Sequence, residues 1–289
     1  MRIALTGAKG WVGQRLYADL ERQHEVVALV GDVRRADTFV VARGFDVLLH
    51  LASPMPWDFK ERFSESVEVS LTGMHLALEA CVRYGASLVF ASTSGVYTRG
   101  LLGAVGEHDD LIRPPELYGQ SKWLAEQICR LYHQSRSIPV RILRLFNLYG
   151  PGQTERLLIG YLLRQVCQKG VIELHHPHDR RDFIHVHDVV RAFAASATRP
   201  FSGLQTINIG SSQAWSVLDV VRFAERMVAY PLDVRLPEQG AMSHESVYAD
   251  ITAARHLLDW QPEITLVAGL ADCLGVANPE VLSETAKLV

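Results

Sequence analysis

The stretch that decides the fold is Arg2-Ile3-Ala4-Leu5-Thr6-Gly7-Ala8-Lys9-Gly10-Trp11-Val12-Gly13. A short apolar run comes first, and apolar residues then recur at four-residue spacing, which predicts a strand, a glycine-rich turn and an amphipathic helix. Glycines let the backbone approach a pyrophosphate, and a helix N-terminus offers free N–H groups at its positive end. The spacing is GxxGxxG rather than GxGxxG, but its place at the first strand–helix junction predicts a dinucleotide site. The cofactor-binding residues expected here are Gly7, Lys9, Gly10, Trp11, Val12 and Gly13.

Apolar runs alternate with helical stretches over the first half of the chain. The predicted strands are 3–5, 26–30, 47–51, 88–91 and 140–145, and the predicted helices between them are 63–84 and 120–134. Continuously apolar strands separated by helices indicate a parallel sheet that is covered on both faces. We therefore expect an α/β, Rossmann-type doubly wound parallel sheet over residues 1–150, to which later segments return. Residues 151–289 are expected to form mainly a small C-terminal substrate-binding region.

Bulk composition excludes several classes of protein. The chain has 289 residues, 48% of them apolar and 21% charged, with a formal net charge of -3. This balance gives no electrostatic basis for binding nucleic acid, and no apolar stretch reaches the roughly 18 residues of a membrane span. The first strand begins too early for a signal peptide, and the four separated cysteines fit buried thiols better than disulfides. A cytoplasmic protein is expected.

Tyr118 and Lys122 form a YxxxK pair in the run Leu117-Tyr118-Gly119-Gln120-Ser121-Lys122. Positions i and i+4 share one face of a helix, so the ammonium is expected near the phenol. A neighbouring cation favours the ionised phenol and lowers its pKa from about 10. The pair therefore predicts a proton donor and acceptor for the interconversion of a hydroxyl and a carbonyl.

The end of the second predicted strand bears on the choice of cofactor. A Rossmann unit normally places an acidic residue there, on the ribose hydroxyls, but this chain has Val30. Without that carboxylate, the bias against a 2′-phosphate is lost, and Lys9, Arg34 and Arg35 could pair with such a phosphate. The alternative is that these three are solvated surface charges. NADP is favoured over NAD, and both stay open.

The chain resembles the extended short-chain dehydrogenases/reductases of the NAD(P)-dependent epimerase/dehydratase family. The matching segments follow one another in the order of the family along nearly the whole chain. They are 6–13, His50-Leu51-Ala52-Ser53, Ala91-Ser92-Thr93-Ser94-Gly95-Val96-Tyr97, 118–122, 144–152, 181–189, Asn208-Ile209-Gly210-Ser211 and 249–260.

The resemblance implies roles for individual residues. Thr93 would hydrogen-bond the reacting oxygen with Ser94 as its neighbour on the substrate side, Tyr118 would be the acid/base, and Lys122 would hold the nicotinamide ribose. Residues implied to line the cofactor site are Asp32, Val33, Leu51, Ala52 and Ser53. Asn147 and Arg181 match positions that commonly hold the diphosphate of a sugar nucleotide, which suits an amide donor and a bidentate cation.

The chain also departs from parts of the family. Dehydratases of the family carry an acidic pair after the catalytic threonine, where this chain has Ser94 and Gly95, so elimination of water is not expected. Many sugar-nucleotide epimerases keep a second arginine in the C-terminal region, and residues 238–245 offer none. No metal site is expected, because the clustered histidines His175, His176 and His178 fall in a predicted loop.

The predicted function is hydride transfer between a nicotinamide and a C–OH/C=O carbon of a small-molecule substrate, which the family resemblance implies to be a nucleotide-linked sugar. The first hypothesis is a ketoreductase acting on a nucleoside-diphosphate 4-keto-(6-deoxy)sugar. The alternatives are an NAD-dependent nucleotide-sugar 4-epimerase, an NADPH-dependent reductase of a non-nucleotide ketone or aldehyde, and a cofactor-sensing protein without turnover. A homodimer through the helices at 63–84 and 120–134 would fit the family.

Overall fold

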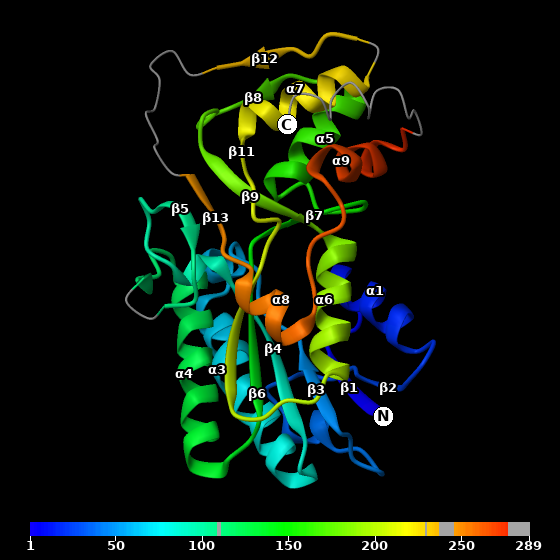
Figure 1. Ribbon diagram of the computed structural model, residues 1–289, viewed down its shortest axis with the longest axis vertical. Helices are drawn as coiled ribbons and strands as arrows, with labels where there is room; N and C mark the ends of the chain where they lie inside the picture. Colours follow the sequence, from blue (N-terminus) through cyan, green and yellow to red (C-terminus); the bar gives the residue numbers. More distant parts are fainter. Residues whose placement is uncertain (109–110, 229, 237–245, 277–289) are drawn as a thin grey trace.

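The computed structural model describes residues 1–108, 111–228, 230–236 and 246–276, and its core is a six-stranded parallel sheet (Figure 1). The strands lie in the order β10-β6-β4-β3-β1-β2. Their bounds are β1 (Arg2–Thr6), β2 (Glu25–Leu29), β3 (Val47–His50), β4 (Ser87–Thr93), β6 (Val140–Leu145) and β10 (Leu204–Ile209). All five predicted strands are present, but the second ends one residue early, so that Val30 lies outside the sheet with 63% of its surface exposed.

Helices cover both faces of this sheet because alternate strand residues point to opposite sides. Ile3 and Leu5 belong to one apolar core, whereas Ala4 between them belongs to another. The first core includes side chains of α1 (Trp11–Leu20) and α6 (Val186–Thr198), and the second includes those of α3 (Phe63–Tyr84) and α4 (Leu117–Arg136). Because helices pack on both faces, most of the buried residues of these strands are apolar, as in parallel strands generally.

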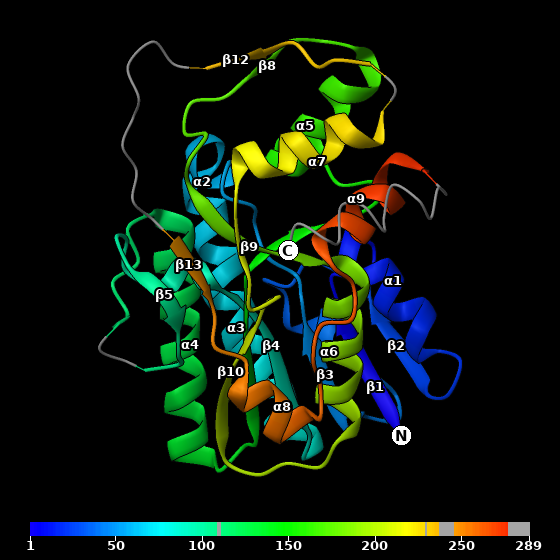
Figure 2. The same cartoon turned by 45° about the horizontal axis from the view of Figure 1, so that its top comes forward.

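A second, smaller layer lies beyond the carboxyl ends of the parallel strands (Figures 1 and 2). Its sheet joins β11 (Ala214–Ser216), β9 (Arg180–His185), β13 (Ser246–Ala249) and β5 (Leu102–Val105), and β7 (Asn147–Tyr149) pairs with β9. Above it lie α5 (Leu158–Gln168), α7 (Val217–Met227), α9 (Leu266–Leu274) and the strand pair β8 (Ile172–Glu173) and β12 (Val234–Arg235). These three helices share a third apolar core.

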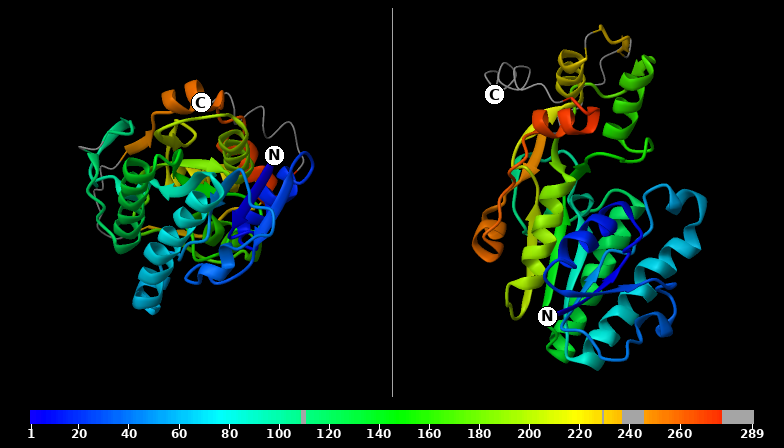
Figure 3. Two further views of the ribbon diagram at one scale, coloured as in Figure 1. Left: turned by 90° about the horizontal axis from the view of Figure 1, so that it is seen from below. Right: turned by 90° about the vertical axis from the view of Figure 1, so that its right-hand side faces the viewer.

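Each of the two regions contains segments from both sides of residue 150, so the two regions are not two consecutive stretches of sequence. The strand β5 belongs to the second sheet although it comes from the first half of the chain. Conversely β10, α6 and α8 (Thr252–Leu258) return to the dinucleotide-type sheet, and the side view shows α6 and α8 against it (Figure 3). No helix among the described residues has the length and apolar character needed to cross a membrane.

Candidate active site

The glycine turn is shaped by backbone contacts that exclude larger residues. Gly7 has a φ of +72°, and a Cβ added to it would lie 2.8 Å from the backbone nitrogen of Ala52. A Cβ on Gly13 would lie 2.0 Å from the carbonyl oxygen of Gly7. The two glycines therefore let the turn pack against both the first helix and the segment after β3, which is the role that a dinucleotide turn requires of them.

The helix that follows the turn begins without a side-chain cap. Gly10 is the N-cap of α1, and the first helical residues are Trp11 and Val12. The Gly10 nitrogen donates to the Gly7 carbonyl over 2.9 Å, which closes the turn. Because no side chain accepts from the first helical N–H groups, this end can receive an anion such as a pyrophosphate. Lys9 is exposed beside it.

Thr6 joins the end of β1 to the end of β3. Its Oγ1 accepts from the backbone nitrogens of Leu51 and Ala52, each over 3.2 Å, and lies 2.9 Å from Nδ1 of His50. With two N–H groups already donating to Oγ1, the hydroxyl proton is directed to the imidazole. Burial, with a smaller contribution from the Lys122 charge, lowers the pKa of His50 to about 3, so the ring is neutral. The predicted cofactor residues Leu51 and Ala52 are thus held against Gly7.

The segment after β3 opens into a pocket of about 210 Å³. Ser53 and Pro54 line it together with Asp58, Arg62, Glu65, Ser66 and Val69 from α2 (Asp58–Glu61), α3 and the turn between them. The loop after β7 reaches the same rim, since Arg156 pairs with Glu61 and stacks over Trp57 at 4.6 Å from the ring centroid. On its other side this loop accepts a hydrogen bond at Pro151 from Trp11 Nε1 over 2.9 Å.

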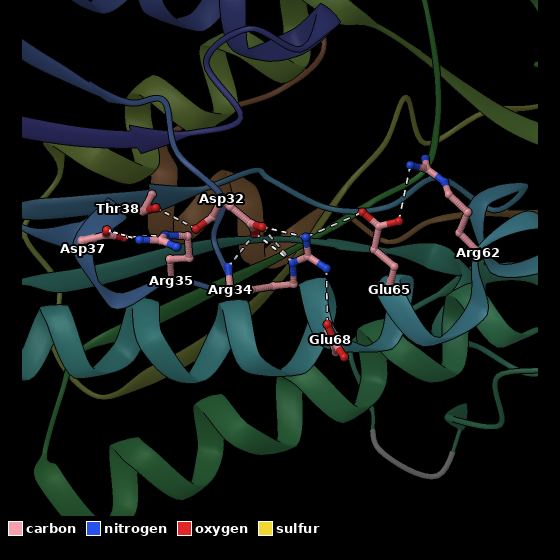
Figure 4. A network of polar contacts seen from close by, with 8 residues as sticks. All are labelled: Asp32, Arg34, Arg35, Asp37, Thr38, Arg62, Glu65 and Glu68. Atoms are coloured by element: carbon pink, nitrogen blue, oxygen red, sulfur yellow. Dashed lines mark hydrogen bonds and ion pairs between the residues drawn. The ribbon is translucent and has the colours of Figure 1, made fainter.

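The residues beyond β2 form a network of charges on the surface (Figure 4). Arg34 donates to both carboxylate oxygens of Asp32 and lies within 4 Å of Glu65 and Glu68. The hydrogen bonds from Arg34 lower the pKa of Asp32 to about 2. Beside this network, Arg35 pairs with Asp37 at 2.7 Å. Arg34 and Arg35, which could pair with a 2′-phosphate according to the sequence, are therefore each bound to a carboxylate of the chain itself.

Val33, which the family resemblance places at the cofactor site, is buried. Its side chain packs against α3, where a Cβ on Gly73 would lie 3.0 Å from it. Asp32 stays partly exposed next to it. The short segment after β2 is thereby anchored on α3, with Asp32 on its solvent side.

Tyr118 and Thr93 come from two elements that pack closely. The helix α4 begins at Leu117, three residues before its predicted start, so Tyr118 lies in the first turn. Thr93 ends β4 and caps the short helix η2 (Ser94–Val96) by accepting from the Gly95 nitrogen over 3.1 Å. A Cβ on Gly119 would lie 2.1 Å from the Gly95 carbonyl oxygen. The glycines at 95 and 119 therefore let the Thr93–Ser94 turn lie directly against the helix that carries Tyr118.

Lys122 is buried beneath Tyr118. Its Nζ donates to the Ala91 carbonyl over 2.6 Å and lies 5.8 Å from the centre of the Tyr118 ring. Burial lowers the pKa of Lys122 to about 7, opposed by the charge of Glu126. Burial also raises the pKa of Tyr118 to about 12. The lowering of the phenol pKa expected from Lys122 is outweighed in this structure by the loss of water around the phenol, because the ammonium donates its hydrogen bond to a carbonyl.

A buried polar network below these residues was not predicted from the sequence. Glu126, one helical turn after Lys122, accepts from Arg144 over 3.1 and 2.8 Å and from Ser92 over 2.5 Å. Arg144 also donates to the Tyr97 hydroxyl, which donates to Asn208 over 2.7 Å. Arg144 and Glu126 are fully buried. The signal for it was present: a charged residue inside the apolar run 140–145 needs a buried partner.

Asn147 and Arg181 lie on neighbouring strands of the second sheet, not on the catalytic helix. The Asn147 amide donates one N–H to the backbone carbonyl of Asp182 over 3.0 Å, so that its second N–H and its oxygen can bind a ligand. Arg181 has 42% of its side chain exposed, and it lies 3.5 Å from Asp179. Asp182 instead accepts from Ser211, Ser212 and the backbone of Ala249, and holds the turn after β10.

The histidines divide into two groups. His175, His176 and His178 are exposed between β8 and β9, as the loop prediction requires. Among the described residues, His185, His187 and Asp272 place one possible ligand atom each within 4.8 Å of one another. His185 Nδ1 accepts from the His187 backbone nitrogen, which directs the ring proton to Nε2, 3.4 Å from Asp272. His185 Nε2 and the Asp272 carboxylate thus form a histidine–carboxylate contact.

The fold and the site together define a Rossmann-type enzyme that binds a nicotinamide dinucleotide and carries a tyrosine–lysine pair beside a threonine turn. The profile of the NAD dependent epimerase/dehydratase family matches residues 3–210. The chain therefore belongs to this family. The relatives to which it is similar include nucleotide-sugar epimerases, decarboxylases and reductases. The fold class and the family predicted from the sequence are both confirmed.

Relatives cover the chain almost from end to end. It is 29% identical to the "Uncharacterized UDP-glucose epimerase YtcB" of Bacillus subtilis (strain 168), over 94% of this chain and 96% of the relative. It is 27% identical to the GDP-6-deoxy-D-mannose reductase of Pseudomonas aeruginosa, over 98% and 99%. The solved structure of MoeE5 with UDP-glucuronic acid and NAD has a TM-score of 0.84 at 27% identity, covering 99% of this chain and 100% of that one. The UDP-glucuronic acid 4-epimerase of Bacillus cereus with the same two ligands has a TM-score of 0.81 at 25% identity, covering 96% and 98%.

Proposed function

We propose that this enzyme is an NAD-dependent 4-epimerase of a UDP-linked hexose or hexuronic acid. The observation that carries the proposal is the surface network at the end of β2. Arg34 is bound to Asp32 and lies near Glu65 and Glu68, and Arg35 is bound to Asp37. An epimerase returns the hydride that it removes, and so it needs a cofactor that stays bound through turnover.

The charge of this network favours NAD over NADP. The residues drawn in Figure 4 comprise four carboxylates and three guanidiniums, joined in ion pairs. A 2′-phosphate would bring further negative charge to a region whose cations already have partners, whereas a ribose hydroxyl can donate to a carboxylate. This reverses the preference for NADP inferred from the sequence, which assumed that Arg34 and Arg35 were free.

The catalytic roles proposed for the chain's residues follow from their hydrogen bonds. The chemistry that a bound NAD would supply is the removal of a hydride from C4 of the sugar and its return to the opposite face of the ketosugar. Thr93 Oγ1 accepts from the Gly95 nitrogen, so its proton is available to hold the sugar oxygen. Tyr118, in the first turn of α4, takes the hydroxyl proton and later gives it back. Lys122 lies beneath the phenol ring and supplies the positive charge that a phenolate needs.

The turn after Thr93 argues against the dehydratase chemistry of the same family. Ser94 and Gly95 form the short helix η2, and neither can act as the acid or base that elimination of water requires. Asn147 and the exposed guanidinium of Arg181 are proposed to bind the substrate diphosphate from the second sheet. Residues 238–245, where the sequence has no second arginine, lie outside the described residues.

The first experiment is to denature the purified protein and identify any released dinucleotide by mass. The emptied protein is then titrated with NADH and NADPH, and UDP-glucose and UDP-glucuronic acid are tested for inversion at C4. Retained NAD, a preference for NADH and inversion of either sugar are expected. An empty protein that prefers NADPH and leaves both sugars unchanged would overturn the proposal.

A second candidate is the ketoreductase that the sequence favoured, acting on a nucleoside-diphosphate 4-keto-6-deoxysugar. It is supported by the likeness to a GDP-6-deoxy-D-mannose reductase and by the exposed cation of Lys9 in the glycine turn. Net oxidation of NADPH in the presence of a 4-keto-6-deoxysugar nucleotide would distinguish it from an epimerase, which consumes no cofactor.

A further inference from the structure

We propose that Glu126 is a positioning residue whose buried carboxylate keeps the Lys122 amine protonated beneath Tyr118. The proposal rests on the catalytic role given to Lys122 in the proposed function. Glu126 lies four residues after Lys122, so both side chains occupy the same face of α4. Neither is accessible to water: Glu126 is 0% exposed and Lys122 is 4% exposed.

A buried ammonium at this place needs a counter-charge. Its hydrogen bond goes to the neutral carbonyl oxygen of Ala91, and its other neighbours include the rings of Phe90 and Tyr118 at 4.9 and 5.8 Å. Aromatic faces and a carbonyl dipole offset only part of the cost of removing a cation from water. Burial lowers the pKa of Lys122 to about 7, and Glu126 acts against this by raising it.

The Glu126 carboxylate is itself fixed by hydrogen bonds from two strands. Arg144 donates to both of its oxygens from β6, and Ser92 donates to one of them from β4. Glu126 thus accepts three hydrogen bonds, two of them from the one guanidinium of Arg144, so its position beneath the catalytic helix turn is fixed. Because Ser92 precedes Thr93 and the Tyr97 hydroxyl accepts from Arg144, the same bonds fix both ends of the catalytic turn.

The other titratable groups around Lys122 and Glu126 are neutral or positively charged, so Glu126 is the anion that acts on Lys122. His50 on β3 is neutral because burial lowers its pKa to about 3. Burial raises the pKa of Tyr97 and of Tyr118 to about 12 and keeps the Cys129 thiol on α4 protonated. Arg144 on β6 is a cation that faces Glu126. Loss of the Glu126 charge would therefore leave Lys122 among neutral groups and a second buried cation.

The charge of Lys122 can be measured without turnover. The chain has five lysines, at positions 9, 60, 122, 169 and 287, so protein labelled with [ε-¹³C]lysine gives few resonances. The Lys122 resonance is assigned by its loss in Lys122→Arg, and its shift is titrated in the full-length protein. The variants are Glu126→Gln, the charge-neutral double variant Glu126→Gln/Arg144→Gln and, as the matched control, Ser92→Ala, which removes a hydrogen bond but no charge.

We expect the midpoint of the Lys122 titration to fall by about one pH unit or more in Glu126→Gln. The double variant should show a fall in the same direction if the single variant does not fold, and Ser92→Ala should change the midpoint by less than about 0.3 unit. An unchanged midpoint in a folded Glu126 variant would overturn the proposal, as would an equal fall in Ser92→Ala.

The pH profile of kcat/KM then separates this proposal from the proposed function. The alkaline limb should move to lower pH in Glu126→Gln together with the NMR midpoint, because the deprotonated amine cannot support a phenolate. If the midpoint falls and the alkaline limb does not move, Glu126 controls the Lys122 charge as proposed, and it is the catalytic role of Lys122 that fails.

Discussion

Two charge networks in this protein use the same pairing of arginine and carboxylate in opposite surroundings. The buried network joins Glu126 and Arg144 with both side chains fully inaccessible, whereas the surface network joins Asp32 and Arg34 with about a third of each side chain exposed. Water and salt screen the surface pair, so it contributes little to stability and acts mainly on the potential that a ligand meets. In the buried pair, each charge depends on the other, because neither has water as an alternative partner. Burial, not the geometry of the pair, therefore determines whether an arginine–carboxylate pair matters for stability or for the choice of ligand.

The strongest test of this comparison removes one guanidinium from each network. Arg144→Met leaves Glu126 buried without its bidentate partner, and we expect the free energy of unfolding to fall by about 3–5 kcal/mol. Arg34→Met is the matched control in the surface network, and we expect no measurable change in the denaturation midpoint. Urea denaturation of both variants at one pH measures the difference. Equal losses of stability would refute the distinction between the two networks.

A third case is His50, which is buried without a counter-ion and is therefore neutral. Its pKa is about 3 in the folded state and about 6.5 in the unfolded chain. The unfolded state takes up the proton first, so the stability that the neutral ring contributes is present above about pH 6.5 and is lost as the pH falls toward 3. Between pH 6.5 and 4.5 we expect wild type to lose about 2–3 kcal/mol more than His50→Gln, measured by urea denaturation. Parallel pH curves would show that His50 does not titrate on unfolding.

The order of elements and the Tyr118–Lys122 pair could be predicted because they depend on local patterns. Short continuous apolar runs identify the strands and apolar residues at helical spacing identify the helices, and the i,i+4 spacing places two side chains on one face. The pKa of Tyr118 could not be predicted, because desolvation depends on packing between distant segments. Nor could the partners of Arg34 and Glu126: Glu65, Glu68 and Arg144 come from other elements that only the tertiary fold brings close.

The buried network ends below Tyr118, and this residue gives the next largest expected effect. Tyr118→Phe removes the hydroxyl that transfers the proton but keeps the ring that packs against Phe59 at 6.3 Å. We expect kcat to fall at least roughly 100-fold, the usual size of an acid/base contribution, with little change in NADH affinity measured by fluorescence. Unchanged turnover would remove Tyr118 from the mechanism and with it the functional reason for a charged Lys122.

The smallest expected effect concerns the surface network and the choice of cofactor. Asp32→Asn removes one carboxylate and frees the guanidinium of Arg34 from its shortest ion pair, 2.6 Å long. A guanidinium that has lost its bidentate carboxylate and keeps only the longer contacts to Glu65 and Glu68 can turn to a 2′-phosphate. The ratio of the Kd values for NADPH and NADH should therefore shift toward NADPH by on the order of tenfold at low salt. The shift should shrink as salt rises, because these charges are screened by solvent. Asp19→Asn, an exposed change of the same type on α1, is the matched control. An equal shift in that control, or one that ignores salt, would mean that the surface network does not select the cofactor, and the buried and surface pairs would then differ in stability alone.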